Sequence, residues 1–417
     1  MGHEILYIIL ASLFGLFLTW SVGANDLANV LSPTVGSKAV SMRQVIIIAL
    51  IFEIAGALLG GSKVATTVQH GIINTALLDS VPEVFIYGML AALLASSIWI
   101  TTASHLGIPV SLTNSIVGSV IGFGLLVLGW RAVQWKMVGF IGLSWVLCPG
   151  IAGVLAFLFF SLIQKTVLSA DDPLEMAKKY LPFFLFLVGI ILAEITVIKS
   201  FKHFNIQINI AENILIATGC GLMIVLIGQF FLSHIYKQPY IDYKEQFALV
   251  EKAFSILVLF TSSAMVYAHG SDDIATATGP VAAVIALARH NPLQNGNTLL
   301  LILTCGYFGV IAGFFTFGRK IIATVGSAIT ELTPSRAFCA TIAAASTVIA
   351  STNLGIPVSA TQTLVGAILG VGLARGIGSI DLRIARNIFM SWFITLPVTA
   401  ILTALIFYCI KFMVFNI

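Results

Sequence analysis

Apolar stretches long enough to cross a lipid bilayer recur along the whole chain, and no other feature of the sequence constrains the fold as much. A helix needs about 20 apolar residues to span a bilayer, so we predict an all-α polytopic membrane protein with about ten to twelve membrane segments. The strands of a membrane β-barrel would instead alternate apolar and polar residues. The apolar runs lie at about 5–22, 44–60, 83–103, 113–129, 137–163, 181–198, 211–232, 252–268, 298–317, 337–352, 363–374 and 387–416.

Composition excludes most other classes of protein. Of the 417 residues, 59% are hydrophobic and 9% are charged, whereas soluble domains carry roughly 25% charged residues. A soluble enzyme, a disordered chain and a secreted disulfide scaffold are therefore excluded. A net charge of +4 without a block of Lys and Arg excludes a nucleic-acid partner. The five scattered cysteines lack metal-ligand spacing, so we expect no transition metal and no cofactor.

The first apolar run lacks the basic start and the cleavage site of a signal peptide, so we expect it to remain as the first membrane helix. The expected location is the membrane itself, as an integral membrane protein, and the plasma (inner) membrane if the cell is prokaryotic.

Two motifs occur twice in the chain, in the same order and at nearly the same separation. Residues 23–29 read Gly-Ala-Asn-Asp-Leu-Ala-Asn, and residues 270–276 read Gly-Ser-Asp-Asp-Ile-Ala-Thr. Residues 107–114 read Gly-Ile-Pro-Val-Ser-Leu-Thr-Asn, and residues 355–362 read Gly-Ile-Pro-Val-Ser-Ala-Thr-Gln. Such paired agreement indicates a tandem duplication.

The duplication predicts the organisation of the chain. We expect a first repeat at 1–163, connecting helices and loops at 164–249, and a second repeat at 250–417. Duplicated membrane halves are typical of secondary transporters, whose substrate sites lie on broken or re-entrant helices where the halves meet.

The first motif places carboxylates where an apolar helix should continue, and such carboxylates are costly to bury and usually functional. Asp26, Asp272 and Asp273 belong to this motif, and Asp26 and Asp273 are equivalent by the repeat. Hard cations prefer oxygen ligands, so these residues and the neighbouring Asn and Thr side chains predict a cation site with Na⁺ favoured. The alternative is a buried polar helix cap with a structural role.

Three further ionisable residues lie in or beside apolar segments. Glu53 is open between a cation ligand and an interfacial carboxylate, and Glu194 is expected near a membrane surface. His269 precedes the second copy of the motif, and we expect a structural histidine there, with a proton relay as the alternative.

The Pro-Val-Ser motif predicts a helix that starts inside the membrane. Pro109 and Pro357 suit the first helical turn, where a missing N–H costs nothing. Hydroxyl and amide groups crowd each helix start beside free backbone N–H groups, which suits an anion, although an ordinary re-entrant turn is the alternative. An anion can lie beside the carboxylates only with cations between them or a shared proton. The side chains concerned are Ser111, Thr113, Asn114, Ser115, Ser359, Thr361, Gln362 and Thr363.

These motifs resemble those of a known family. Residues 23–29 look like the Gly-Ala-Asn-Asp-Val-Ala-Asn signature of the inorganic phosphate transporter (PiT) family, and residues 268–276 are similar to its second copy. The Pro-Val-Ser segments match the other repeated motif of the family. The resemblance covers nearly the whole chain and implies two inverted repeats. It also implies symport of phosphate with Na⁺ in some branches and H⁺ in others, while some bacterial relatives carry sulfate.

The motifs and the resemblance together predict two overlapping sets of ligands. The substrate-binding set is Asp26, Ser111, Thr113, Asn114, Asp273, Ser359, Thr361 and Gln362. The cation-binding set is Asn25, Asp26, Asn29, Asp272, Asp273 and Thr276. The sequence departs from the family pattern at Asp272 and Thr276, which replace Asn, and at Asn114 and Gln362, where the family often has His.

We therefore expect a secondary active symporter of inorganic phosphate driven by a cation gradient, with Na⁺ favoured, and not an enzyme. The alternatives are an H⁺-coupled phosphate carrier, a sulfate carrier, an anion channel and an intramembrane aspartyl protease that uses Asp26 and Asp273 as a pair. The expected partners are phosphate and the lipid bilayer, and a homodimer is left open.

Overall fold

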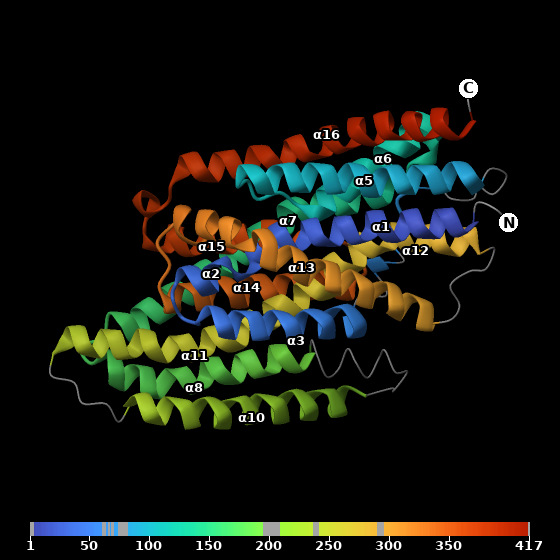
Figure 1. The fold of residues 1–417 in the computed structure, drawn as a ribbon. Coiled ribbons are helices and arrows are strands. Elements are labelled where there is room, and N and C mark those ends of the chain that lie inside the picture. The colour runs from blue at the N-terminus through green and yellow to red at the C-terminus, as the bar shows by residue number, and fades with distance from the viewer. Residues whose placement is uncertain are drawn as a thin grey trace.

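The computed structural model describes residues 4–60, 64–65, 67, 71–73, 82–194, 209–236, 242–289 and 296–415. These residues form an all-α bundle of long helices that lie roughly side by side (Figure 1). Each predicted apolar run overlaps one of the helices. Eight helical segments of the described chain are long and apolar enough to span a membrane. The remaining apolar runs form the helices α6, α8, α14 and α15, which are shorter or more polar.

The helices follow the same order in the two halves of the chain. The first half contains α1 (Glu4–Val22), η1 (Gly23–Leu27), α2 (Ala28–Gly36), α3 (Met42–Gly60), α5 (Pro82–Leu106), α6 (Leu112–Leu128) and α7 (Trp135–Ile163). The helices α8 (Pro173–Leu192) and α10 (Ile210–Tyr236) lie between the halves. The second half contains α11 (Tyr243–His269), η6 (Gly270–Ile274), α12 (Ala275–Ala288), α13 (Gly296–Ala328), α14 (Pro334–Asn353), α15 (Ala360–Arg375) and α16 (Leu382–Phe415).

The outer surface of the bundle carries large apolar side chains. Leu226 of α10, Val146 of α7 and Phe393 of α16 are 71%, 70% and 74% exposed, respectively. Large apolar side chains exposed in such number mark contact with lipid or another apolar partner. The membrane location predicted from the sequence is confirmed.

Two helical hairpins enter the bundle from opposite ends. The hairpin α5–α6 opens on the side of the chain termini, whereas α14–α15 opens on the opposite side, where α16 begins (Figure 1). Each hairpin turns at the glycine of the Pro-Val-Ser motif, since Gly107 and Gly355 have φ angles of 71° and 73°. These angles favour glycine, which has no Cβ to clash. The two hairpin tips meet inside the bundle, where the Thr113 hydroxyl donates to the Val358 carbonyl over 2.8 Å.

The sequence suggested that the acidic motifs break their helices, but in the structure these helices continue through the motifs. Each forms one wide π-helical turn, η1 or η6, and the chain continues as α2 or α12. The flanking residues Val22 and Ala28 keep right-handed helical dihedral angles. Pro33 and Pro280 also lie inside helices. The interruption is therefore a local widening of the helix and not a break. Such π turns often mark functional sites.

A glycine at the start of each acidic motif permits a close helix crossing. A Cβ on Gly23 would overlap the carbonyl oxygen of Val310 on α13, and a Cβ on Gly270 would overlap the carbonyl oxygen of Glu53 on α3. Each π turn therefore packs against a helix of the other half of the chain. This interlocking brings both acidic motifs to the centre of the bundle.

Candidate functional site

The centre of the bundle contains more acidic than basic groups. Asp26, Glu53, Asp272 and Asp273 are all buried, as is His269, while no lysine or arginine whose side chain the structure describes is buried. Buried charges are tolerated only when they are paired or coordinated. Asp26, Glu53 and Asp273 outnumber the one imidazole of His269 even when that imidazole is positively charged, so the site fits bound cations or protons.

Asp26 connects the first acidic motif with the second hairpin. Its Oδ1 accepts a hydrogen bond of 2.7 Å from the hydroxyl of Thr361, at the start of α15. Its Oδ2 is buried and has no hydrogen-bond partner among the described residues. One carboxylate oxygen is thus used to position Asp26 across the two halves, and the other is available to a ligand.

Asn25 and Asp272 occupy equivalent places in the two halves. The Asn25 Oδ1 accepts from the backbone N–H of Val110 over 3.2 Å, and the Asp272 Oδ2 accepts from the backbone N–H of Val358 over 3.3 Å. Asn25 also donates from Nδ2 to Ser104 and to the Ile108 carbonyl. Asp272 therefore keeps the acceptor role of Asn25 and adds a negative charge.

His269 joins two carboxylates from different helices. Its Nδ1 lies 2.7 Å from the Glu53 Oε1 on α3, and its Nε2 lies 3.3 Å from the Asp273 Oδ2. The Nδ1 contact is a hydrogen bond, whereas the Nε2 contact is a close approach of charged groups without hydrogen-bond geometry. Two neighbouring carboxylates favour the positively charged form of the imidazole.

The sequence left Glu53 open between a cation ligand and an interfacial carboxylate, and it predicted a structural histidine at 269. The contact between Glu53 and His269 was not predicted, although the apolar segments around both residues indicated that each needs a polar partner. Glu194 is exposed and is not part of the cluster.

The two acidic motifs are therefore not equivalent, although the sequence repeat relates Asp26 to Asp273. Asp26 is held by a neutral hydroxyl, whereas Asp273 is held by His269. The equivalent of Thr361 in the first hairpin, Thr113, donates to a backbone carbonyl instead of a carboxylate. Asp26 is therefore positioned by a neutral donor and Asp273 lies against an imidazole, although each has a buried oxygen without a hydrogen bond among the described residues.

Serine residues start both hairpin helices. The Ser111 hydroxyl accepts from the Asn114 N–H over 3.2 Å, and the Ser359 hydroxyl accepts from the Gln362 N–H over 3.1 Å. The prediction that Pro109 and Pro357 occupy the first helical turn is wrong, because both precede the serine that caps the helix. A side-chain oxygen at the cap position satisfies an N–H that the helix leaves free, so each helix begins after its serine and not at the proline.

The structure brings most of the predicted residues together at this junction, but it distributes their roles unevenly. Asn29 donates from Nδ2 to the Asn25 Oδ1 over 3.3 Å. The Asn29 Oδ1 and the Thr276 Oγ1 are buried without a hydrogen-bond partner among the described residues. Asn114 donates from Nδ2 to the Trp392 carbonyl over 3.3 Å, and both Asn114 and Gln362 also line an apolar cavity beside the site.

An all-α membrane fold with two opposed hairpins and a buried, carboxylate-rich centre defines a class of protein, the integral membrane transporters. The chain belongs to the phosphate transporter family, whose sequence profile matches residues 22–403. It is therefore a transporter and not an enzyme, which excludes the aspartyl protease alternative.

Similar proteins cover nearly the whole chain. A candidate phosphate permease of Haemophilus influenzae is 41% identical over 407 residues, covering 96% of each chain. A candidate phosphate permease of Pyrococcus abyssi is 37% identical over 404 residues, covering 96% of this chain and 97% of the other. A solved structure described as the sodium-dependent phosphate transporter is 34% identical, with a TM-score of 0.89, and the match covers 98% of this chain and 100% of that chain.

Proposed function

We propose that the protein is a symporter that moves inorganic phosphate together with Na⁺. The observation that carries the proposal is the excess of buried carboxylates at the point where the two hairpin tips meet. In this proposal, 1–163 and 250–417 are the two repeats, 164–249 connects them, and the ligands bind between the repeats.

Two places on the acidic motifs suit a hard cation. Asp26 and Asn29 are one helical turn apart in the first motif, and each has a buried oxygen without a hydrogen-bond partner in the described part of the chain. Asp273 and Thr276 have the same spacing in the second motif, where the Thr276 hydroxyl oxygen is likewise buried and unpartnered. Na⁺ takes oxygen ligands, so each pair offers part of a cation site. Asn25 and Asp272 would support these sites from the preceding positions.

The hairpin tips suit phosphate. The helices α6 and α15 both start at this junction, and a helix start offers free N–H groups and a partial positive charge to an anion. Thr113, Thr361, Asn114 and Gln362 lie in the first turns of these helices. The neighbouring carboxylates would repel phosphate unless cations lay between them, and this requirement is the physical basis of coupling in our proposal.

Binding of phosphate and Na⁺ must then be linked. If bound Na⁺ tightens phosphate binding by some factor, phosphate must tighten Na⁺ binding by the same factor. Calorimetric titration of the purified protein with phosphate, in Na⁺ and in choline buffers, measures the first factor. Titration with Na⁺ at two phosphate concentrations measures the second. We expect phosphate to bind at least about tenfold more tightly in Na⁺, a coupling of about 1.4 kcal/mol.

Sulfate and protons are the controls of this experiment. Unlabelled sulfate should not displace phosphate, and lowering the pH in choline buffer should not replace Na⁺. Phosphate binding that is the same in Na⁺ and in choline would contradict Na⁺ coupling, and preferential binding of sulfate would contradict the assignment of the anion.

A further inference from the structure

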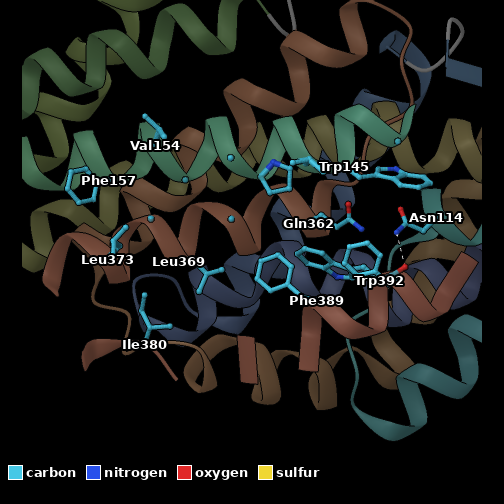
Figure 2. A pocket seen from close by; sticks show the side chains of 18 of the residues that line it. Asn114, Trp145, Val154, Phe157, Gln362, Leu369, Leu373, Ile380, Phe389 and Trp392 are labelled. Carbon is cyan, nitrogen blue, oxygen red and sulfur yellow. Dashed lines mark hydrogen bonds between the residues drawn. The ribbon is translucent and has the colours of Figure 1, made fainter. Parts of the chain in front are cut away.

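The apolar cavity that Asn114 and Gln362 line lies beside the charged site, on the lipid-facing side of the bundle. It has a volume of about 800 Å³ and runs between α7, α15 and α16 (Figure 2). Phe157, Leu373 and Ile380 line one end, whereas Asn114, Gln362 and Trp392 line the other (Figure 2). We call it the α7–α15 groove. A volume of this size suits a lipid- or drug-sized molecule.

The groove is open to the hydrocarbon of the bilayer. Several of its apolar lining residues are also among the exposed ones, including Val146, Val154 and Phe393. Glycines at the floor of the groove allow α7 and α15 to cross closely, since a Cβ on Gly370 would overlap the carbonyl oxygen of Gly153. A molecule dissolved in the membrane can therefore enter the groove from the side.

The inner end of the groove contains polar atoms that the protein itself does not satisfy. The Gln362 Oε1 and the Nε1 atoms of Trp145 and Trp392 are buried and have no hydrogen-bond partner among the described residues. Gln362 is 1% exposed and Trp392 is 5% exposed. Leaving such groups unpaired in an apolar surrounding is unfavourable. Lipid tails alone cannot satisfy them, so the occupant of the groove needs a polar head.

We propose that the α7–α15 groove binds an uncharged amphiphile with a single hydroxyl head, that is, a long-chain alcohol dissolved in the membrane. The unpartnered atoms at the inner end are two indole N–H donors and one amide oxygen acceptor. A hydroxyl group offers the complement, one O–H donor and two acceptor lone pairs. None of the described residues that line the groove is basic, so none of them favours a negatively charged head.

The length of the groove sets the size of the tail. Gln362 and Leu373 mark its two ends along α15, and eleven residues of helix rise roughly 16 Å, which matches an extended chain of on the order of 12 carbons. We therefore use dodecanol as the probe.

A molecule bound in the groove should also slow transport, and this part of the proposal rests on the proposed function. The Gln362 N–H bonds the Ser359 hydroxyl at the cap of α15, and the adjacent Thr361 holds Asp26. A head bound at Gln362 would hold the tip of the α14–α15 hairpin in place. Because transport requires this junction to open, dodecanol should slow phosphate uptake.

Binding is measured first and without transport. Trp145 and Trp392 line the inner end of the groove, where the head binds, so 2-bromododecanol, which carries its bromine beside the hydroxyl, should quench the tryptophan fluorescence of the purified protein. 2-Bromododecane, which lacks the hydroxyl, should quench at least fivefold less at equal concentration. This readout is valid even if the protein moves neither Na⁺ nor phosphate, so failure of the proposed function and failure of this proposal are distinguishable.

Two glycines of α7 provide matched variants. A side chain at Gly150 or at Gly139 would meet no neighbour within 4 Å, but only Gly150 lines the groove. Gly150→Leu should remove most of the quenching by bromododecanol and the inhibition of uptake by dodecanol, while Gly139→Leu should keep both. Trp392→Phe keeps a ring but loses the N–H, and it should raise the half-inhibitory concentration of dodecanol about fivefold.

Three results would overturn the proposal. The first is equal quenching by the alcohol and the alkane, which would mean that the polar atoms do not select the ligand. The second is undiminished quenching in Gly150→Leu, which would place the alcohol elsewhere. The third is no specific quenching in the wild type, as expected if lipid tails or a second copy of the chain fill the groove.

Discussion

Asp26→Asn is expected to lower Na⁺-driven phosphate uptake about 100-fold, since losing a buried charged ligand costs on the order of 3 kcal/mol. The change keeps the shape of the side chain, and an amide oxygen can still accept the hydrogen bond of Thr361. Only the negative charge and the unpartnered carboxylate oxygen are lost. Uptake of labelled phosphate into proteoliposomes with an inward Na⁺ gradient measures the effect.

Asp172→Asn is the matched control for this prediction. Asp172 caps α8 by accepting from the Glu175 N–H over 3.0 Å at an exposed position, and asparagine caps a helix equally well. This variant should transport as the wild type does. An Asp26→Asn protein that folds and keeps wild-type uptake with unchanged Na⁺ dependence would remove Asp26 from the cation site.

His269→Leu is expected to lower the free energy of unfolding by about 3–5 kcal/mol, because it leaves buried carboxylates without their positive partner. Glu53 and Asp273 would then face each other across an apolar side chain at the crossing of α3 and η6. Unfolding of the detergent-solubilised protein by increasing SDS, followed by circular dichroism, measures the loss. The prediction concerns stability and does not depend on which ion drives transport.

A second substitution separates charge from packing. Adding Glu53→Gln to His269→Leu removes one of the two uncompensated charges, so the double variant should be more stable than the single variant. His234→Leu on α10, where the histidine is on the surface and bonds the Phe230 carbonyl, should have no more than a small effect. If the double variant is no more stable than His269→Leu, the loss comes from packing and the electrostatic explanation is wrong.

The sequence was sufficient to predict most of the fold. Every predicted apolar run overlaps a helix, because a membrane-spanning segment must be long and apolar whatever its neighbours are. The Pro-Val-Ser motif also predicted a helix that starts inside the membrane, and α6 and α15 both start inside the bundle, shortly after Gly107 and Gly355. These signals are local, so a single sequence carries them.

The partners within the site were not readable from the sequence. The repeat relates Asp26 to Asp273, but Thr361 holds the first and His269 holds the second. His269 is only one helical turn from Asp273, but Thr361 is far from Asp26 in the chain and Glu53 is far from His269, so these two contacts depend on how α3, α13 and the hairpins pack. The π turns at the acidic motifs were also missed, since an Asn-Asp pair fits a helix break as well as a widened turn.

The central claim is that a Na⁺ gradient drives phosphate across the membrane through this site. The most direct test is the uptake of labelled phosphate into proteoliposomes under an inward Na⁺ gradient, an inward H⁺ gradient or no gradient, with unlabelled sulfate as competitor. Our account predicts accumulation above equilibrium only with the Na⁺ gradient, insensitive to sulfate and lost in Asp26→Asn. Accumulation driven by the H⁺ gradient alone, or transport of sulfate in place of phosphate, would contradict it.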